Sequence, residues 1–310
     1  MEVIKQQLYK YPIRERNKWD KDDFQPLSDY KVSIRLDDGN IIECAGFKML
    51  IKNKIDNHAC ISSQAGCKFG CKFCSSGKNG YARNLSRIEM LGEVKILLDK
   101  LAIKKFDRII FMGIGEPLDN ADEIIKTVKL LSRKNNYYNG VRKMALATVG
   151  IPNHLKKLAQ YKLPVDVWIS LHAADDKKRN ELMPVNKASS VSKTVSAALY
   201  YSKTVNRPVC INYMVFKGFN DGIVDANNLS KLLNGTEKNF ILLITRPNSD
   251  YKQYKKASYK DLLSFEKKLI NAGIKNEINR FLTAGVAIKA GCGEFIFIPI
   301  TKAPQQLPRS

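Results

Sequence analysis

Short apolar runs alternate with helical stretches along most of this chain, and this alternation limits its fold more than any other feature. The pattern is typical of a parallel sheet whose strands are joined by right-handed helical crossovers. The units are too few for a closed eightfold barrel, so we predict an α/β fold with a partial (β/α)6 barrel over residues 56–300. The expected strands are 108–112, 144–148, 164–171, 209–216 and 240–244, and the expected helices are 87–101, 122–133, 152–158, 192–203, 223–233 and 258–272.

The first 55 residues have a different pattern. Two strand-like runs, 31–36 and 40–44, flank Asp37-Asp38-Gly39, which is a hairpin signal. We therefore predict a small N-terminal β extension at 1–55. Residues 301–310 contain two prolines, and we expect them to form a flexible tail.

Three of the seven cysteines, Cys67, Cys71 and Cys74, have the spacing C-x3-C-x2-C. An odd number of cysteines with one tight group is not typical of a secreted disulfide framework. Three thiolates can hold three irons of a [4Fe–4S] cluster, which leaves the fourth iron open to a ligand that is not protein. Zinc is the alternative, but structural zinc usually takes four ligands, often as two C-x2-C pairs. The sequence contains no second pair.

This spacing resembles the signature of the radical S-adenosylmethionine (SAM) superfamily. The resemblance implies that SAM binds the open iron and is cleaved by one electron to a 5′-deoxyadenosyl radical. Ligands of parallel α/β barrels lie at the carboxyl ends of strands, so we expect Glu116 to bind the SAM ammonium group and Thr148 its carboxylate or ribose. Ordinary turns and a structural histidine are the alternatives. The residues expected to contact SAM at strand ends are Gly115, Glu116, Thr148, Ser170, Leu171 and His172.

Several blocks resemble one subfamily more closely. Cys60-Ile-Ser-Ser-Gln-Ala-Gly-Cys67 resembles the CVSSQ-GC block of the RlmN/Cfr family, and Ala290-Gly-Cys-Gly293 resembles its AACGQ block. Members of that family are radical SAM methyltransferases that act on adenine carbons of RNA. The resemblance covers about residues 57–295. The other segments that match in order are 84–85, 112–118 with Asn120, 170–173, 183–186 and 220–221.

The resemblance implies roles for two more cysteines. Cys292 is first methylated by one SAM, and a second SAM supplies the radical that removes hydrogen from the S-methyl group. The methylene group then adds to an sp2 carbon of adenine, and Cys60 removes a proton and forms a disulfide with Cys292 to release the product. Such exchange needs accessible thiolates. For either cysteine alone, the alternative is a buried packing residue, which is what we expect of Cys44 and Cys210.

Other positions match the family less closely. Glu43 is the nearest match to the acidic residue that serves the family as a proton acceptor, but its spacing to Cys60 is longer. Asn248 resembles an asparagine that contacts SAM, although the residues just before it depart from the family's pattern. The loop 284–290 lacks the family's acidic stretch, and Glu294 stands where glutamine is usual. The residues before Cys60 are too few for the family's N-terminal helical domain together with the β extension.

A formal net charge of +22 favours a polyanionic partner, although a lysine-rich composition can arise without one. With the resemblance, RNA becomes the expected partner, and a flavodoxin- or ferredoxin-type protein the expected electron donor. No apolar run could span a membrane and the start lacks a secretory signal, so we expect a soluble, cytoplasmic monomer. The candidate RNA contacts are Lys68, Lys72, Lys78 and Arg83, and the aromatic residues that could hold a base are Phe69, Phe73 and Tyr81.

Three functions fit these patterns. One is a methyltransferase that acts on an RNA adenine, which the basic charge favours. Another is the same chemistry on a nucleotide-like small molecule, a peptide or a natural-product intermediate, which the altered loop before Cys292 favours. The last is a non-catalytic RNA-binding protein with a structural cluster, but such a module needs neither Cys60 nor Cys292. For Phe69, Phe73 and Tyr81, packing around the cluster is the alternative to holding a base.

Overall fold

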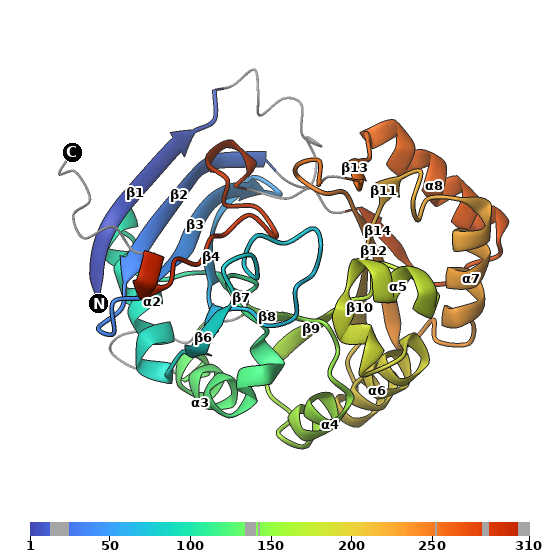
Figure 1. Ribbon diagram of the computed structural model, residues 1–310, viewed down its shortest axis with the longest axis horizontal. Coiled ribbons are helices and arrows are strands. Elements are labelled where there is room, and N and C mark those ends of the chain that lie inside the picture. Colours follow the sequence, from blue (N-terminus) through green and yellow to red (C-terminus); the bar gives the residue numbers. More distant parts are fainter. Residues whose placement is uncertain (13–24, 134–140, 142, 252, 281–284, 303–310) are drawn as a thin grey trace. The chain divides into compact units, whose positions relative to one another are not determined.

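The computed structural model describes residues 1–12, 25–133, 141, 143–251, 253–280 and 285–302 (Figure 1). The chain divides into two compact units. Residues 303–310, most of the expected 301–310 tail, lie outside the described residues. The first unit comprises Met1–Lys68, Ser75–Ala145 and Ala284–Ser310, and the second comprises Phe69–Cys74 and Leu146–Thr283.

The first unit is built on an antiparallel meander that continues into a parallel pair. Its strands are hydrogen-bonded in the order β1-β2-β3-β4-β7, with β4 and β7 parallel. The tight turn between β2 and β3 confirms the predicted hairpin: Leu36 N donates to Asn40 O at 2.8 Å, and Gly39 has a φ of 85°. Only glycine adopts that backbone region at little cost. The strands are β1 (Glu2–Lys10), β2 (Gln25–Arg35), β3 (Ile41–Ile51), β4 (Lys54–Ile61) and β7 (Arg108–Phe111).

Helix α2 (Arg87–Leu101) packs on one face of this meander. A Cβ added to Gly46 of β3 would lie 2.5 Å from Leu101 Cδ1, so glycine permits the close approach. Because side chains alternate along a strand, Cys44 and Gly46 share the helix side, while Glu43 points to the opposite face. The remaining elements of this unit are β5 (Gln64–Gly66), β6 (Tyr81–Asn84), α3 (Ala121–Ser132) and the short 3-10 helices η1 (Pro117–Asn120), η3 (Val286–Ile288) and η4 (Ile300–Lys302).

The second unit has parallel strands joined by helices. Hydrogen-bonded neighbours run in the order β9-β10-β12-β14, and β8 (Lys143–Thr148) begins in the first unit and ends in this one. Its strands are β9 (Val165–Ser170), β10 (Val209–Met214), β12 (Phe240–Thr245) and β14 (Ile278–Arg280), with a small pair β11 (Phe216–Lys217) and β13 (Lys255–Lys256). Its helices are α4 (Pro152–Gln160), α5 (Asp176–Leu182), η2 (Pro184–Lys187), α6 (Val191–Val205), α7 (Ile223–Leu233) and α8 (Tyr259–Asn271).

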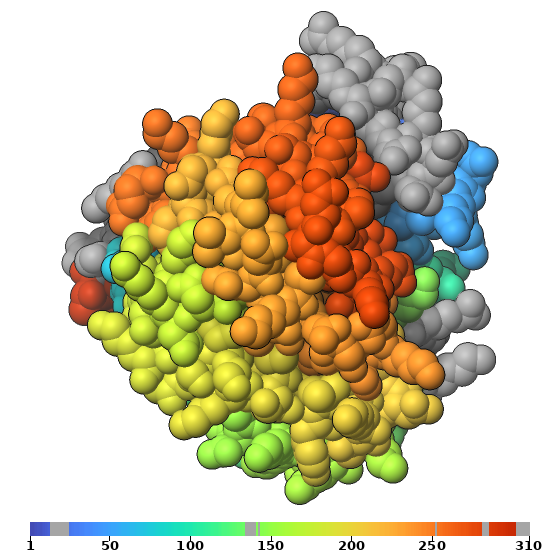
Figure 2. Space-filling model, turned by 90° about the vertical axis from the view of Figure 1, so that its right-hand side faces the viewer, coloured from blue at the N-terminus to red at the C-terminus, as the bar shows by residue number. Residues whose placement is uncertain are grey.

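The outer helices cover the parallel strands of the second unit with apolar side chains. Leu262, Phe265 and Leu269 of α8 are buried, and the Phe265 ring stacks on Tyr213 of β10 with centroids 5.3 Å apart. Figure 2 shows the outward face of α7 and α8, coloured orange. No helix in the described part of the chain is long and apolar enough to cross a bilayer.

Candidate active site

The loop from Cys67 to Cys74 leaves strand β5 through a turn that requires glycine. Gly66 has a φ of 85°, and an added Cβ would lie 2.2 Å from Gly80 O. Cys67 N donates to the same carbonyl at 2.9 Å, and Cys74 N donates to Cys71 O at 3.1 Å. All three cysteines are half-buried, so their thiols are shielded without being fully enclosed.

The three cysteines of the loop are divided between the two units. Cys67 belongs to the first unit, and Cys71 and Cys74 belong to the second. Within the described ranges, no three His, Cys, Asp or Glu side chains are grouped so that they could hold one metal ion. A [4Fe–4S] cluster makes a different demand, because each thiolate binds a separate iron. Three cysteines with soft sulfur donors suit iron–sulfur chemistry.

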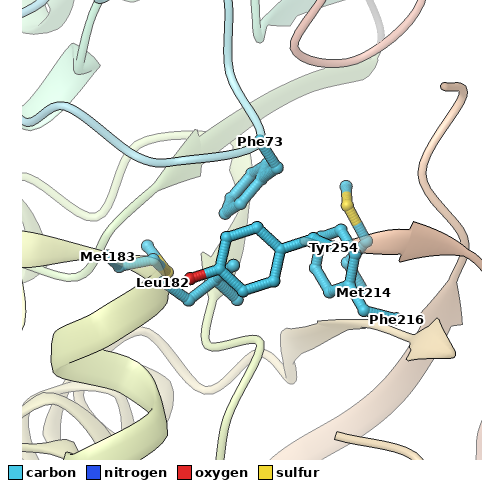
Figure 3. Close-up of a cluster of buried hydrophobic side chains, with 6 residues drawn as sticks. All are labelled: Phe73, Leu182, Met183, Met214, Phe216 and Tyr254. Atoms are coloured by element: carbon cyan, nitrogen blue, oxygen red, sulfur yellow. The ribbon is translucent and has the colours of Figure 1, made fainter. Parts of the chain in front are cut away.

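Aromatic and sulfur-containing side chains surround the second part of this loop. Phe73 is buried, and its ring meets His172 edge-on with centroids 5.0 Å apart. Lys72 N also donates to Leu182 O at 3.0 Å, which fixes the loop to the end of α5. Phe73 therefore packs in a core instead of standing free to hold a base. Figure 3 shows this cluster, which contains Phe73, Leu182, Met183, Met214, Phe216 and Tyr254, with Cys71 and Cys74 packed against it.

His172, which follows the end of β9, is buried. It has a φ of 59°, and its Nδ1 accepts a hydrogen bond from Met214 N at 3.0 Å. Burial and the nearby Arg179 lower the pKa of His172 to about 3, so the ring is neutral at physiological pH. The ring packs on Phe73, and contact of His172 with SAM stays a prediction.

Arg179 was not among the residues singled out from the sequence. It is buried, its Nε donates to Leu171 O at 3.0 Å, and its Nη2 donates to Ser170 O at 3.2 Å and Val149 O at 2.8 Å. Burial lowers its pKa to about 10, while the Cys71 thiol favours its charged form. Arg179 thus binds the strand-end carbonyls of Ser170 and Leu171 and lies within electrostatic reach of Cys71. The signal in the sequence was weak, because Arg179 sits in a polar run without an apolar stripe.

The glycines after β7 are needed for packing within the first unit. A Cβ on Gly113 would lie 2.7 Å from Ile61 C, and one on Gly115 would lie 2.5 Å from Gln64 Cβ. Glu116 is buried; its N donates to Gln64 Oε1 at 2.8 Å and its Oε1 accepts from Leu118 N at 2.9 Å. Its carboxylate therefore caps η1, and binding of SAM by Glu116 stays a prediction.

Two further candidates for SAM binding lie in the second unit. Thr148 ends β8, and its Oγ1 accepts from Gly150 N at 3.0 Å. The carbonyl oxygen of Asn248 accepts from Lys256 Nζ at 2.6 Å. Both interactions shape loops at strand ends, and contact of either residue with SAM stays a prediction.

Cys60 and Cys292 both belong to the first unit. Cys60, near the end of β4, is 8% exposed, and Cys292 is half-buried. Burial, together with the neighbouring Cys292, raises the pKa of the Cys60 thiol well above its usual value. Two residues far apart in the sequence are thus brought within electrostatic reach of each other. Cys44, on the helix side of β3, is buried, as expected for packing.

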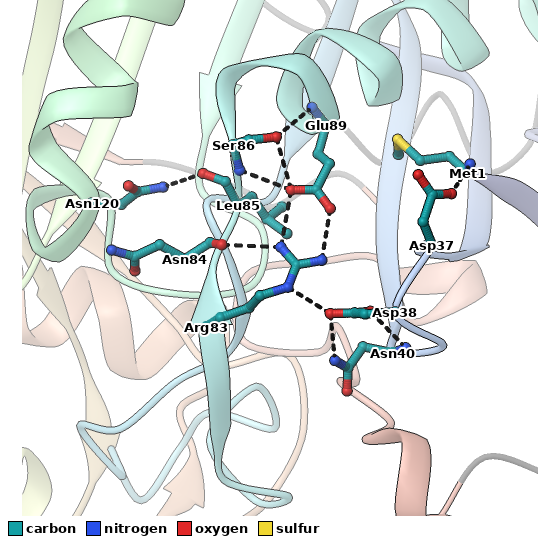
Figure 4. Close-up of polar contacts among 10 residues, drawn as sticks. All are labelled: Met1, Asp37, Asp38, Asn40, Arg83, Asn84, Leu85, Ser86, Glu89 and Asn120. Atoms are coloured by element: carbon teal, nitrogen blue, oxygen red, sulfur yellow. Dashed lines mark hydrogen bonds and ion pairs between the residues drawn. The ribbon is translucent and has the colours of Figure 1, made fainter.

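The basic residues near the cysteine loop differ in how firmly they are paired. Arg83 donates to both carboxylate oxygens of Glu89, at 2.8 and 3.0 Å, and to Asp38 at 2.5 Å (Figure 4). Lys68 forms an ion pair with Asp119 at 2.8 Å. Arg83 therefore joins the β2–β3 turn to the start of α2 and is a poor candidate for contacting RNA.

Comparison with known proteins identifies the family. Residues 61–228 match the model of the Radical SAM superfamily. The chain is 37% identical over 264 residues to the "Probable dual-specificity RNA methyltransferase RlmN" of Pseudothermotoga lettingae, covering 85% of this chain and 74% of that protein. The chain belongs to the RlmN family of radical SAM enzymes. An RlmN relative from Thermotoga petrophila is also 37% identical, over 280 residues that cover 87% of this chain and 79% of that one.

The solved structures agree with the RlmN assignment at the level of fold. A radical SAM methyltransferase from Sphaerobacter thermophilus superposes with a TM-score of 0.79 at 24% identity, covering 95% of this chain and 80% of that one. The predicted α/β fold of the partial-barrel type is confirmed. As an RlmN-family protein, the chain is a radical SAM methyltransferase, and its cofactors are a [4Fe–4S] cluster and SAM.

Proposed function

We propose that this RlmN-family enzyme methylates a carbon of adenine in RNA and carries the methyl group on Cys292. The observation that carries the proposal is that Cys60 and Cys292, on segments remote in the sequence, both belong to the first unit and lie within electrostatic reach of each other. A cluster-binding protein without this chemistry has no need to bring these two thiols together. The names of the relatives, which describe RNA methyltransferases, support the choice of substrate.

Cys67, Cys71 and Cys74 are the proposed ligands of the cluster. Their half-burial suits cluster ligation, and the sequence of the loop holds no fourth cysteine. When bound, the cluster and SAM supply the 5′-deoxyadenosyl radical. The proposed contacts with SAM are Gly115, Glu116, Thr148, Ser170, Leu171, His172 and Asn248.

We assign different roles to the two cysteines: Cys292 transfers the methyl group, and Cys60 releases the product. Cys292 is the more exposed of the two, so it can present its sulfur to SAM and then to the base. Cys60 lies buried beside it, and its raised pKa keeps it protonated until the product must be released. Once it has lost its proton, the Cys60 sulfur attacks the Cys292 sulfur and forms the disulfide as the bond between Cys292 and the transferred carbon breaks; the electron pair of that bond passes to the carbon, which takes up a proton to complete the methyl group.

RNA as the acceptor fits the charge of the chain. A net charge of +22 attracts the phosphate backbone. Lys72 and Lys78 are exposed, whereas Arg83 and Lys68 are paired with carboxylates. We propose Lys72 and Lys78 as the phosphate contacts near the cysteine loop.

The test is expression in a host that lacks its own adenine-C2 methyltransferase, followed by digestion of total RNA to nucleosides. We expect mass spectrometry to detect 2-methyladenosine or 8-methyladenosine with the wild-type protein and neither nucleoside with Cys292→Ala. Purified wild-type protein should carry about fourteen extra daltons on Cys292, the mass of one methylene unit. A methylated Cys292 without any methylated adenine would exclude RNA and point to another acceptor for the same chemistry.

A further inference from the structure

Strand β2 carries a row of charged side chains on a buried face. Asp29, Lys31 and Ser33 occupy alternate positions along the strand, so they share one face, and all three are buried. Glu43 of β3 lies directly opposite Ser33 in the register and therefore shares that face. Burying charges in this way is unfavourable unless each is paired and hydrogen-bonded. The hydrogen-bond partners of these side chains therefore indicate what the row does in the fold.

The partners are backbone groups of the segment that contains Cys292, residues 285–298, termed here the Cys292 segment. Lys31 Nζ donates to Lys289 O at 3.0 Å, and Glu43 Oε2 accepts from Ile296 N at 2.8 Å. Asp29 Oδ2 accepts from Gly285 N at 3.0 Å. The contacts made by Lys31 and Glu43 lie on either side of Cys292.

Lys31 and Glu43 also bind each other. Lys31 Nζ lies 2.8 Å from Glu43 Oε2, and Glu43 Oε1 accepts from Ser33 Oγ at 3.2 Å. Both side chains are shielded, with 7% and 12% of their surface exposed. Both oxygens of Glu43 already accept hydrogen bonds, which suits a fixed support better than a group that must receive a proton.

The same face carries Cys60. In the register of the sheet, Lys31 pairs with Ala45, and Ala45 pairs with Cys60. The three residues therefore form one row across β2, β3 and β4, with their side chains on one side. The group that holds Lys289 and the thiol that must meet Cys292 project from the same row.

The opposite side of the Cys292 segment is held by neutral hydrogen bonds. Ser75 N donates to Gly293 O at 2.7 Å, Ser76 Oγ donates to Phe295 O at 3.2 Å, and Asn79 Nδ2 donates to Phe297 O at 2.7 Å. These contacts restrain the segment after Cys292, whereas Asp29 and Lys31 contact the stretch before it, and of these two contacts that of Lys31 with Lys289 lies nearer to Cys292. Loss of Lys31 should therefore free Cys292 on one side without detaching the whole segment.

We propose that Lys31 and Glu43 are positioning residues, which hold the Cys292 segment over the sheet face that carries Cys60. This inference rests on the proposed role of Cys292 as the methyl carrier, and it assigns Glu43 a support role in place of the proton acceptor that the family resemblance implies. Positioning matters because a misplacement of about 1 Å can slow a reaction by about a hundredfold.

The test compares Lys31→Met in the holoenzyme with the matched control Lys48→Met, which removes an exposed lysine from β3. Two quantities are measured: hydrogen exchange of the amides at 289–296, and methylated adenine formed per 5′-deoxyadenosine. In Lys31→Met we expect exchange to rise about tenfold and the product ratio to fall between about tenfold and a hundredfold. Lys48→Met and the conservative Lys31→Arg should resemble the wild type in both. Exchange and product ratio equal to those of Lys48→Met would overturn the proposal.

Glu43→Gln provides a second route if Lys31→Met does not fold. A positioning role predicts faster exchange at Ile296 together with a lower product ratio. Loss of product with wild-type exchange would make Glu43 a proton acceptor and would refute the support role. Failure of the proposed function looks different, because the wild-type enzyme itself would then lack a methyl group on Cys292, while the exchange experiment would still report on the support.

Discussion

Single residues in this enzyme show how burial decides protonation. Glu93 of α2 is fully buried; its Oε2 accepts from Ser62 N at 2.8 Å, and its Oε1 has no hydrogen-bond partner among the described residues. Burial raises the pKa of Glu93 well above its usual value, and the hydrogen bond from Ser62 only partly opposes this. Glu89, on the same helix, adds a like charge that raises it further. Glu93 is therefore a neutral acid near the Cys44 and Cys60 thiols.

Glu93→Gln should remove a pH dependence of stability. Because the folded-state pKa is raised, Glu93 contributes most below the pKa of the unfolded chain, and that contribution is lost as pH rises toward the folded-state pKa. Glutamine keeps the oxygen that accepts from Ser62 N but cannot ionise. We expect the stability of the variant relative to wild type to increase from pH 5 to pH 8, by at most about 1.4 kcal/mol per pH unit. Urea unfolding at several pH values measures this, and a pH-independent difference would show that Glu93 is ionised in the fold.

The sequence predicts those site residues that belong to motifs with a distinctive spacing. It does not predict those whose partners are distant in the sequence. Cys60, Cys67 and Cys292 stood out because they belong to compact blocks whose spacing is distinctive. Lys31 did not, because its partner Lys289 is 258 positions away and nothing local marks either residue. Arg179 was missed for a similar reason, since all but one of the partners given for it are backbone carbonyls, which any sequence could supply.

At the scale of elements, local signals fixed boundaries well where helices carry caps. The predicted ranges 87–101 and 223–233 agree with α2 and α7 to the residue, and α2 has a full capping box between Ser86 and Glu89. Strand β4 was not predicted because Lys54, Asp56 and Asn57 interrupt its apolar pattern. Hydrogen bonding to β3 and β7 stabilises β4 as a strand, although its own sequence has only a weak strand pattern.

Arg83→Met should weaken the junction between the β2–β3 turn and α2. The substitution removes the paired contact with Glu89 and the contact with Asp38, so Glu89 keeps only its capping bonds with Ser86. Because the Arg83 side chain is 36% exposed, solvent screens these pairs. We expect a loss of about 1 kcal/mol. Lys95→Met, which breaks an exposed i,i+4 pair with Asp99 on the same helix, should cost about 0.5 kcal/mol or less. Equal midpoints of urea unfolding for the two variants would contradict the stabilising role of Arg83 at this junction.

At the scale of the whole molecule, charge should govern the encounter with RNA. Each phosphate contact releases counterions, so affinity falls steeply as salt is added. We expect the double variant Lys72→Gln/Lys78→Gln to lower the slope of log affinity against log salt by about 1 to 2. The control Lys238→Gln changes another exposed lysine in the second unit. Filter binding of RNA across a salt series measures the slopes, and a double variant that matches the control would remove both lysines from the interface.

The attachment of the Cys292 segment to β2 and β3 has a consequence for biosynthesis. Residues that pair in the fold, such as Glu43 and Ile296, are separated by 253 positions, so the ribosome makes one long before the other. During translation, Asp29, Lys31 and Glu43 have no Cys292 segment to bind until most of the chain has been synthesised. Contacts of such sequence separation form slowly. Cys292 can therefore be seated beside Cys60 only after synthesis is nearly complete, and a nascent chain cannot start turnover before its carrier arrives.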